Sequence, residues 1–176
     1  MLSALQYIRD HALDVNLIKH HCEMLGVLPV IFNDWGGFGF ATRAEWKTVR
    51  EAGRTWIEPA PWIGVKDQGE VIDLVAWRAD EPRSIATLHG QAIGLGFDQL
   101  TNPATWAFGE RLMVHRTPLR WLQAGCKGYV PLDHRHAFMA LRLALGDIEA
   151  EDDDHAQVLD RLINPGEWSH EIIVPT

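Results

Sequence analysis

A carboxylate and two imidazoles stand within four residues in the segment LDHRH, at Asp133, His134 and His136. The segment directly follows a predicted strand, and neutral imidazoles together with a carboxylate suit zinc or another transition metal. His115, at the end of the preceding predicted strand, could supply a further ligand. This pattern predicts a small metal-dependent hydrolase as one function for the chain.

The same residues also have a purely structural interpretation, in which Asp133 caps a helix and both histidines lie on its first turn. Successive residues of a helix diverge by about 100°, so His134 and His136 would then face different sides. The sequence contains no HExxH motif and no second His or Cys pair at zinc spacing. On this interpretation we expect no structural metal there, and we expect both histidines to be at least partly exposed.

Other motifs for catalysis are weaker. The GFGF segment at 37–40 lacks the third glycine of a phosphate-binding loop and falls within a predicted hairpin. Cys126 stands beside Lys127, and a neighbouring cation can activate a thiol, but one such neighbour does not make a catalytic dyad. The sequence therefore predicts no catalytic residue and no cofactor.

Six acidic residues stand within the eight residues of the tract Asp147–Asp154. The tract lacks the glycine and the ligand spacing of a calcium loop. It is typical of a solvated loop, and Asp154 at its end can cap a following helix. A second interpretation is a contact patch for a basic partner.

Eight tryptophans are many for a chain of 176 residues. Trp77 lies in a predicted strand and Trp121 in a predicted helix, where we expect both to fill the core. Trp35 lies at a predicted hairpin tip beside Gly36 and Gly37, with little core to pack against. These three residues are therefore the predicted partner-binding site, with Trp35 as the anchor for a protein partner.

The net charge is −8, with 16 Lys and Arg against 24 Asp and Glu. Arg111, Arg116 and Arg120 are close in sequence, but three arginines make a small basic footprint on an acidic protein. Because too few cations are available to drive counterion release, we expect no non-specific binding to nucleic acid.

Two isolated cysteines, Cys22 and Cys126, form no CxxC pair and are typical of a reduced compartment. The N-terminus lacks the basic and apolar regions of a signal peptide, and no apolar run reaches the roughly 20 residues of a membrane span. We therefore expect a cytoplasmic protein that does not bind membranes.

The chain is predicted to be a single α+β domain over 1–176, in which a mixed or mainly antiparallel sheet carries packed helices. Residues 1–25 are expected to be helical, and 26–176 to form the sheet and further helices. Proline-rich 55–63 is predicted to be an edge strand or an irregular loop. Further strands are predicted at 26–33, 38–42, 70–77, 111–116, 128–132 and 170–176, and helices at 43–52, 81–92, 103–108, 117–125, 134–146 and 155–163.

Two of these helices carry distinct capping patterns. Thr42 and Glu45 form a T-x-x-E capping box before 43–52. Thr117 and Gly125 bracket the segment TPLRWLQAG, with proline at its first helical position. We expect Trp121 and Leu122 of that helix to pack inward.

Two segments, EVIDLVAWRADEP and RLMVHRTPLRWLQAGCKGYVPLD, resemble uncharacterised small proteins carried by alphaproteobacterial chromosomes and prophages. The resemblance covers about a third of the chain, and its motifs are structural, mainly a capped helix between two strands. It implies a place in mobile-element biology and no catalytic residue.

These observations predict a non-enzymatic accessory or binding protein that acts through a protein partner. The alternative is the small metal-dependent hydrolase that uses Asp133, His134 and His136.

Overall fold

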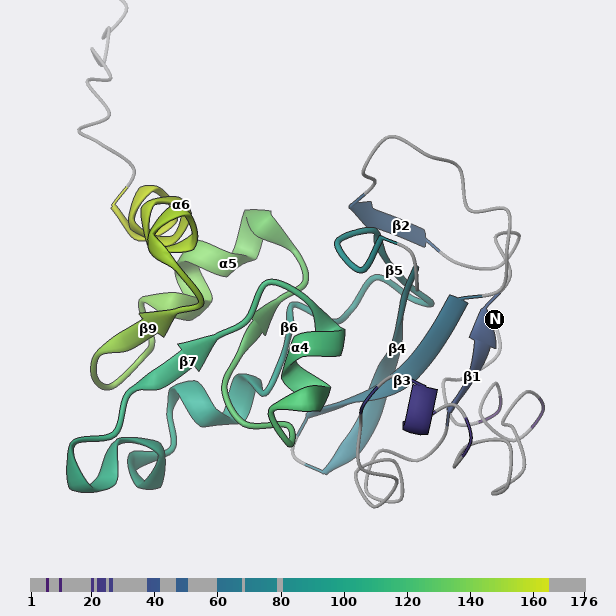
Figure 1. The fold of residues 1–176 in the computed structure, drawn as a ribbon, viewed down its shortest axis with the longest axis horizontal. Coiled ribbons are helices and arrows are strands. Elements are labelled where there is room, and N and C mark those ends of the chain that lie inside the picture. The colour runs from purple at the N-terminus through teal and green to yellow at the C-terminus, as the bar shows by residue number, and fades with distance from the viewer. Residues whose placement is uncertain are drawn as a thin grey trace, which may run out of the picture.

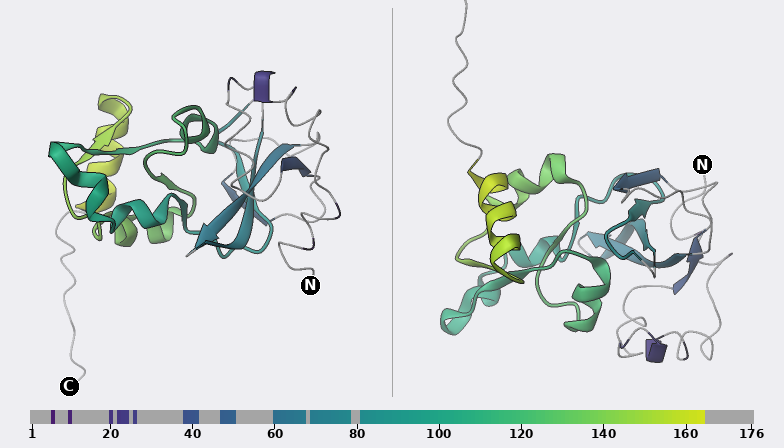
Figure 2. Two further views of the ribbon diagram at one scale, coloured as in Figure 1. Left: turned by 90° about the horizontal axis from the view of Figure 1, so that it is seen from below. Right: turned by 45° about the horizontal axis from the view of Figure 1, so that its top comes forward.

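The architecture comes from a computed structural model, which has a sheet at one end and a group of helices with short strands at the other (Figure 1). A view from below shows the same division (Figure 2). The structure describes residues 6, 10, 20, 22–24, 26, 38–41, 47–50, 60–67, 69–78 and 81–164.

Five strands form the main sheet in the described part of the chain, in the order β1-β3-β4-β5-β2 with every neighbouring pair antiparallel. The predicted α+β class with a mainly antiparallel sheet is confirmed. The strands are β1 Phe38–Ala41, β2 Lys47–Arg50, β3 Ala60–Asp67, β4 Glu70–Trp77 and β5 Ile85–Thr87.

β4 lies at the centre of this sheet, as its continuous apolar run predicts. Leu74, Val75 and Trp77 are fully buried, and Trp77 packs in one core with Ile63 of β3 and Trp121. The core interpretation of both tryptophans is therefore confirmed.

The helix predicted at 43–52 is wrong, because Lys47–Arg50 is strand β2, paired with β5. The capping box that motivated the prediction, Thr42 and Glu45, lies outside the described residues. Thr48 and Val49 are β-branched, which favours a strand when a partner is present. The open edge of β5 supplies that partner and overrides the local preference for a helix.

The helix predicted at 81–92 is also wrong, since Ile85–Thr87 is the buried strand β5. The chain then turns at Gly90, whose φ is +71°. The buried carboxylate of Asp73 holds this turn by accepting backbone N–H bonds from Gln91 at 2.7 Å and Ala92 at 3.1 Å. In a helix, these N–H groups would donate to backbone carbonyls four residues earlier. Here they donate to the Asp73 side chain of β4, so the segment is not helical.

The prediction for 55–63 needs correction where the structure describes it. β3 lies between β1 and β4, so it is neither an edge strand nor an irregular loop. Pro61 stands near the start of the strand, opposite Phe40 of β1, where a missing N–H disturbs the pairing least.

The other half of the molecule contains short elements, some of which add residues to the core of the sheet while the others surround a second core that includes Leu112, Tyr129 and Leu159. Asn102 caps η3 by accepting a bond from the Ala104 N–H, which confirms the predicted helical turn at 103–108. The elements are β6 Gly94–Leu95, η2 Phe97–Leu100, η3 Pro103–Gly109, β7 Leu112–Val114, α4 Pro118–Gln123, β8 Val130–Pro131, α5 His134–Leu141, β9 Ile148–Ala150 and α6 Asp153–Ile163.

Three expectations for this half are wrong. α5 ends at Leu141 and does not run to Gly146. Gly146 instead passes beside Trp106, where an added Cβ would lie 2.7 Å from the ring. The tract 147–154 is not one solvated loop, because Ile148–Ala150 pairs with β7 as strand β9 and leaves a short connection to α6. The cap of α6 is Asp152, not Asp154, since helix α6 already begins at residue 153.

Several predicted segments lie wholly or mainly outside the described residues. Among 1–25, the described residues 22–24 are helical, and Gly26 has a φ of +66°. The hairpin tip with Trp35, Gly36 and Gly37 and the strand predicted at 170–176 are not described. Among the described helices, none is long and apolar enough to cross a membrane.

Candidate functional site

The candidate site lies where β7 and β9 end. The two strands pair in parallel, with Val114 opposite Ala150, so their carboxyl ends meet at one edge. His115 and Arg116 follow β7, and Glu151 and Asp152 follow β9. Strand pairing therefore brings together ionisable side chains that are 35 positions apart in the chain.

Arg116 forms a bidentate ion pair with Asp152, the residue that caps α6. The Arg116 side chain also lies 3.7 Å from a carboxylate oxygen of Glu151, and its backbone N–H donates to Glu151 at 3.2 Å. The hydrogen bond from Arg116, followed by the backbone N–H of His155, holds the pKa of Asp152 well below its ordinary value. The same pair raises the pKa of Arg116. Both groups are therefore charged at neutral pH.

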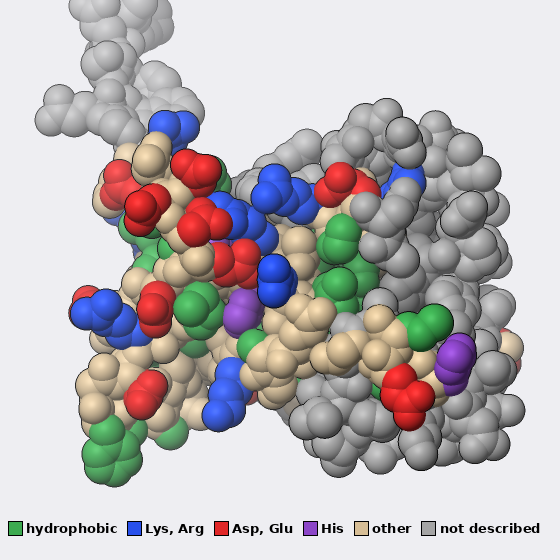
Figure 3. Space-filling model, in the orientation of Figure 1, with side chains coloured by type: hydrophobic (Ala, Val, Ile, Leu, Met, Phe, Trp, Pro, Cys, Tyr) green, Lys and Arg blue, Asp and Glu red, His purple; other side chains and the backbone are tan. Residues whose placement is uncertain are grey.

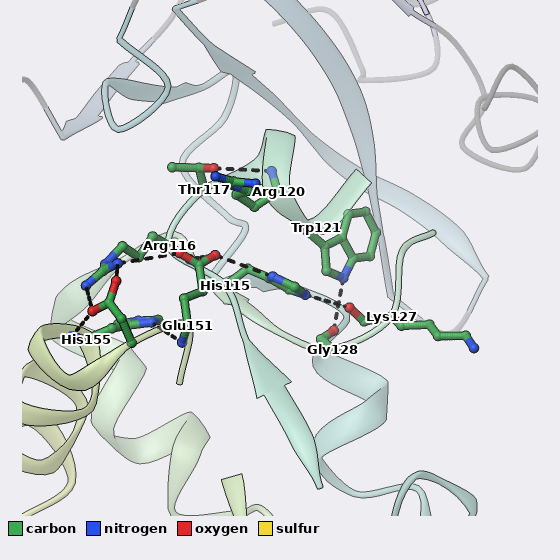
Figure 4. Close-up of polar contacts among 10 residues, drawn as sticks. His115, Arg116, Thr117, Arg120, Trp121, Lys127, Gly128, Glu151 and His155 are labelled. Atoms are coloured by element: carbon green, nitrogen blue, oxygen red, sulfur yellow. Dashed lines mark hydrogen bonds and ion pairs between the residues drawn. The ribbon is translucent and has the colours of Figure 1, made fainter. Parts of the chain in front are cut away.

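His115 is buried and engages both of its ring nitrogens (Figure 4). Nε2 lies 2.9 Å from the backbone carbonyl of Lys127, which can only accept, so Nε2 donates this hydrogen bond. Nδ1 faces Glu151 Oε1 at 3.5 Å. The imidazole thus joins the end of β7 to the loop before β8 and to the β9–α6 junction.

His155 is the second buried imidazole of the site, with 4% of its surface exposed. The backbone N–H of Glu151 donates to its Nδ1 at 3.2 Å, so that nitrogen is an acceptor. Burial, and next the nearby positive charge of Arg116, lower the pKa of His155. The ring is therefore neutral at physiological pH, with its proton on Nε2.

Helix α4 and the loop after it form the opposite wall. The hydroxyl of Thr117 accepts from the Arg120 N–H at 3.2 Å, and Trp121 and Leu122 are fully buried, which confirms the prediction for this helix. The Trp121 indole donates to the Gly128 carbonyl at 2.9 Å. Gly128 has a φ of +92°, and an added Cβ would lie 2.3 Å from the carbonyl oxygen of Met113. Glycine is required here, and it sets the position of the Lys127 carbonyl on His115.

These walls enclose an open cleft of about 540 Å³, which we term the junction cleft. A neighbouring hollow of about 450 Å³ shares four of its lining residues, Arg116, Arg120, Gln123 and Glu151. Figure 3 shows basic and acidic side chains intermingled over this face. The lining of the junction cleft is Met113, His115, Arg116, Arg120, Gln123, Ala124, Glu151 and Asp152.

Arg120 differs from Arg116 in its surroundings. It is exposed on α4, and among the described residues no hydrogen bond or ion pair reaches its guanidinium. Arg116 is neutralised by Asp152, so Arg120 is the cation that the junction cleft presents to a ligand. The cluster of Arg111, Arg116 and Arg120 expected from the sequence is therefore divided, with Arg116 taken up by an internal ion pair.

The residues of the LDHRH segment lie apart from this cleft. His136 Nδ1 is 2.8 Å from Asp133 Oδ2, and the His136 side chain is 57% exposed, as predicted. His134 begins α5, and its side chain is outside the described set. His115 is bonded to Lys127 and Glu151 instead. Among the described side chains, no three His, Cys, Asp or Glu residues are grouped closely enough to hold a metal ion.

Sequence reasoning missed the roles of Glu151, Asp152 and His155. The acidic tract 147–154 was interpreted as a solvated loop, because a strand of only three residues has no strong local pattern. Alternation of Ile148, Glu149 and Ala150 was the available sign of a strand, but it is too short to stand out against six acids.

No family model, no curated protein and no solved structure matches the chain. Its function is therefore inferred from the geometry of the site.

Proposed function

We propose that this chain is a non-enzymatic accessory protein that binds a protein partner through the junction cleft. The observation that carries the proposal is the bonding of His115, whose two ring nitrogens both face partners within the fold. A general base or nucleophile needs a nitrogen directed at its substrate. The resemblance of two segments to prophage-carried proteins supports a place in mobile-element biology.

The partner chemistry follows from the charges that line the junction cleft. Arg116 is paired with Asp152, while Arg120 is exposed and charged at the edge between the two hollows. An arginine fork is suited to a carboxylate, which it can bind in a bidentate manner. We therefore propose that the partner places an Asp or Glu side chain on Arg120. The scarcity of cations also supports a protein partner over non-specific nucleic acid.

Site-specific photocrosslinking tests this proposal. A photoreactive phenylalanine derivative replaces Gln123, which lines the cleft, and in a control protein it replaces Gln157, which is exposed on α6. In extracts of the native host, we expect one adduct from position 123 that is absent from position 157. Arg120→Glu should abolish this adduct, whereas Arg120→Lys should retain part of it.

The result that would overturn the proposal is an adduct insensitive to Arg120→Glu, or equal labelling from both positions. Low-salt gel shifts with random duplex DNA provide a second check. Micromolar binding that weakens steeply with salt would replace the protein partner with nucleic acid.

A second candidate is the metal-dependent hydrolase, and the contact between Asp133 and His136 favours it. Histidines that bind metals commonly donate their other N–H to a carboxylate, and Asp133 holds His136 Nδ1 in that way. His136 Nε2 would then be directed to a metal, and the further ligands would have to come from elements other than α5, because His134 and His136 face different sides of this helix. A stoichiometric ion in purified protein, together with chelator-induced loss of thermal stability that His136→Ala abolishes, would establish it.

A further inference from the structure

Phe108 is the most exposed large hydrophobic residue that the structure describes, with its surface fully accessible at 104%. It stands at the end of η3 with a φ of +61° and a ψ of +20°, followed by Gly109 at a φ of +80°. This left-handed conformation is unusual for a bulky residue, and such strain is concentrated at functional positions. Trp106, two residues earlier, packs against the second core. The fold thus partly buries the Trp106 ring and projects the Phe108 ring outward.

An apolar groove lies on the same half of the molecule, between β9 and α6. Its volume is about 210 Å³. An apolar cavity of about 150 Å³ is large enough to take benzene, whereas pockets for drug-sized ligands begin at about 300 Å³. The β9–α6 groove therefore fits a single aromatic side chain. It is lined by Ile148, Ala150, Ala156, Leu159, Asp160 and Ile163.

The charges beside these two features are complementary. Phe108 is followed by Glu110 and Arg111, which are both exposed. The groove carries Asp160 in its lining and Arg161 next to it, also exposed. When a ring enters the groove, Arg111 can approach Asp160 while Glu110 approaches Arg161. Such pairing of opposite charges specifies which surfaces meet.

We propose that the chain associates with a second copy of itself, with Phe108 of one copy inserted into the β9–α6 groove of the other. Figure 1 places the segment before β7 and helix α6 at different ends of the same half of the molecule. The contact is therefore heterologous, since the projecting ring and its groove belong to different surfaces. Each pair leaves one ring and one groove free, so association extends as concentration rises.

Sedimentation velocity over a range of concentrations tests the association. We expect the wild-type mass to rise with concentration, and Phe108→Ala to weaken association by at least about tenfold. The matched control is Met139→Ala, which removes another exposed hydrophobic side chain, 59% exposed on α5, and should leave association unchanged. Thermal melts of the variants check that each is folded.

A complementation experiment is specific for the heterologous contact. Ala156→Trp fills the groove and leaves Phe108 intact, so each single variant should be monomeric. An equimolar mixture of Ala156→Trp and Phe108→Ala should nevertheless form a one-to-one complex, because one chain supplies the ring and the other the groove. If Ala156→Trp fails to fold, Asp160→Arg replaces it, and Arg111→Asp in the same chain should restore association.

A wild-type protein that stays monomeric at all concentrations would overturn the proposal. Equal disruption by Met139→Ala and Phe108→Ala, or a mixture that remains monomeric, would do the same.

Discussion

The neutral state of the buried His155 makes the stability of the site depend on pH. Its Nδ1 accepts the Glu151 N–H, and protonation would remove this acceptor and place a second positive charge near Arg116. His155→Gln removes the titrating group and retains a polar side chain. We therefore predict that acidification destabilises the wild type more than it destabilises this variant.

The size of the effect follows from linkage. The ordinary pKa of the imidazole is 6.5, so in the unfolded chain it is about nine-tenths protonated at about pH 5.5. Because the folded-state pKa is lowered, the stabilisation is present above pH 6.5 and is lost as the pH falls below it. The upper bound of this loss in unfolding free energy is about 1.4 kcal/mol at about pH 5.5, which is reached when the ring stays fully neutral in the folded protein.

Urea unfolding followed by tryptophan fluorescence at about pH 7.5 and 5.5 measures the difference, because Trp77 and Trp121 are fully buried. The gap in unfolding free energy between wild type and His155→Gln should narrow by about 1 kcal/mol on acidification. The control, His136→Gln, removes a 57% exposed imidazole and should not reproduce this narrowing. Asp152 does not contribute to this pH dependence. Because its pKa is lowered, the stabilisation from its charged form is lost only below pH 3.8. A gap that is constant over this range would refute the neutral, buried state of His155.

Three further predictions concern residues that support the site and the sheet. Thr117→Ala should lower the unfolding free energy by about 1 kcal/mol through loss of the α4 cap, and an unchanged urea midpoint would contradict it. Gly128→Ala should cost on the order of 2–4 kcal/mol, because the new Cβ meets the Met113 carbonyl at a positive φ; a variant as stable as the wild type would show that the loop relaxes freely. Asp73→Asn should cost on the order of 2–4 kcal/mol by leaving buried N–H donors such as that of Ala92 without an acceptor, and unchanged hydrogen-exchange protection of Ala92 would disprove this role.

Local residue patterns were enough to predict the elements whose structure depends on near neighbours. Thr117 and Pro118 start α4 and Gly125 follows it, and Asn102 caps η3, because each cap bonds to an N–H two or three residues away. The central position of β4 was also predictable, since a run of apolar residues can be buried only where both faces are covered.

Tertiary structure decided the elements whose backbone groups find distant partners. Lys47–Arg50 is a strand because β5 offers it an edge, and Ile85–Thr87 is a strand because β4 does. The turn that follows is held by Asp73, which bonds to N–H groups 16 to 19 positions further along. Local propensity contributes only tenths of a kcal/mol per residue, so a ladder of hydrogen bonds to a buried strand outweighs it.

The candidate site also depends entirely on partners that are distant in the sequence. His115 and Arg116 meet Glu151 and Asp152 only because β7 and β9 pair in parallel over three residues each. The alternation of Ile148, Glu149 and Ala150 is too short to predict a strand among these acids, because solvation of charge is the stronger local tendency. Pairing with β7 supplies hydrogen-bond partners for the backbone of Ile148–Ala150. It also places the carboxylates that follow beside Arg116, where charge-assisted hydrogen bonds replace their bonds to water.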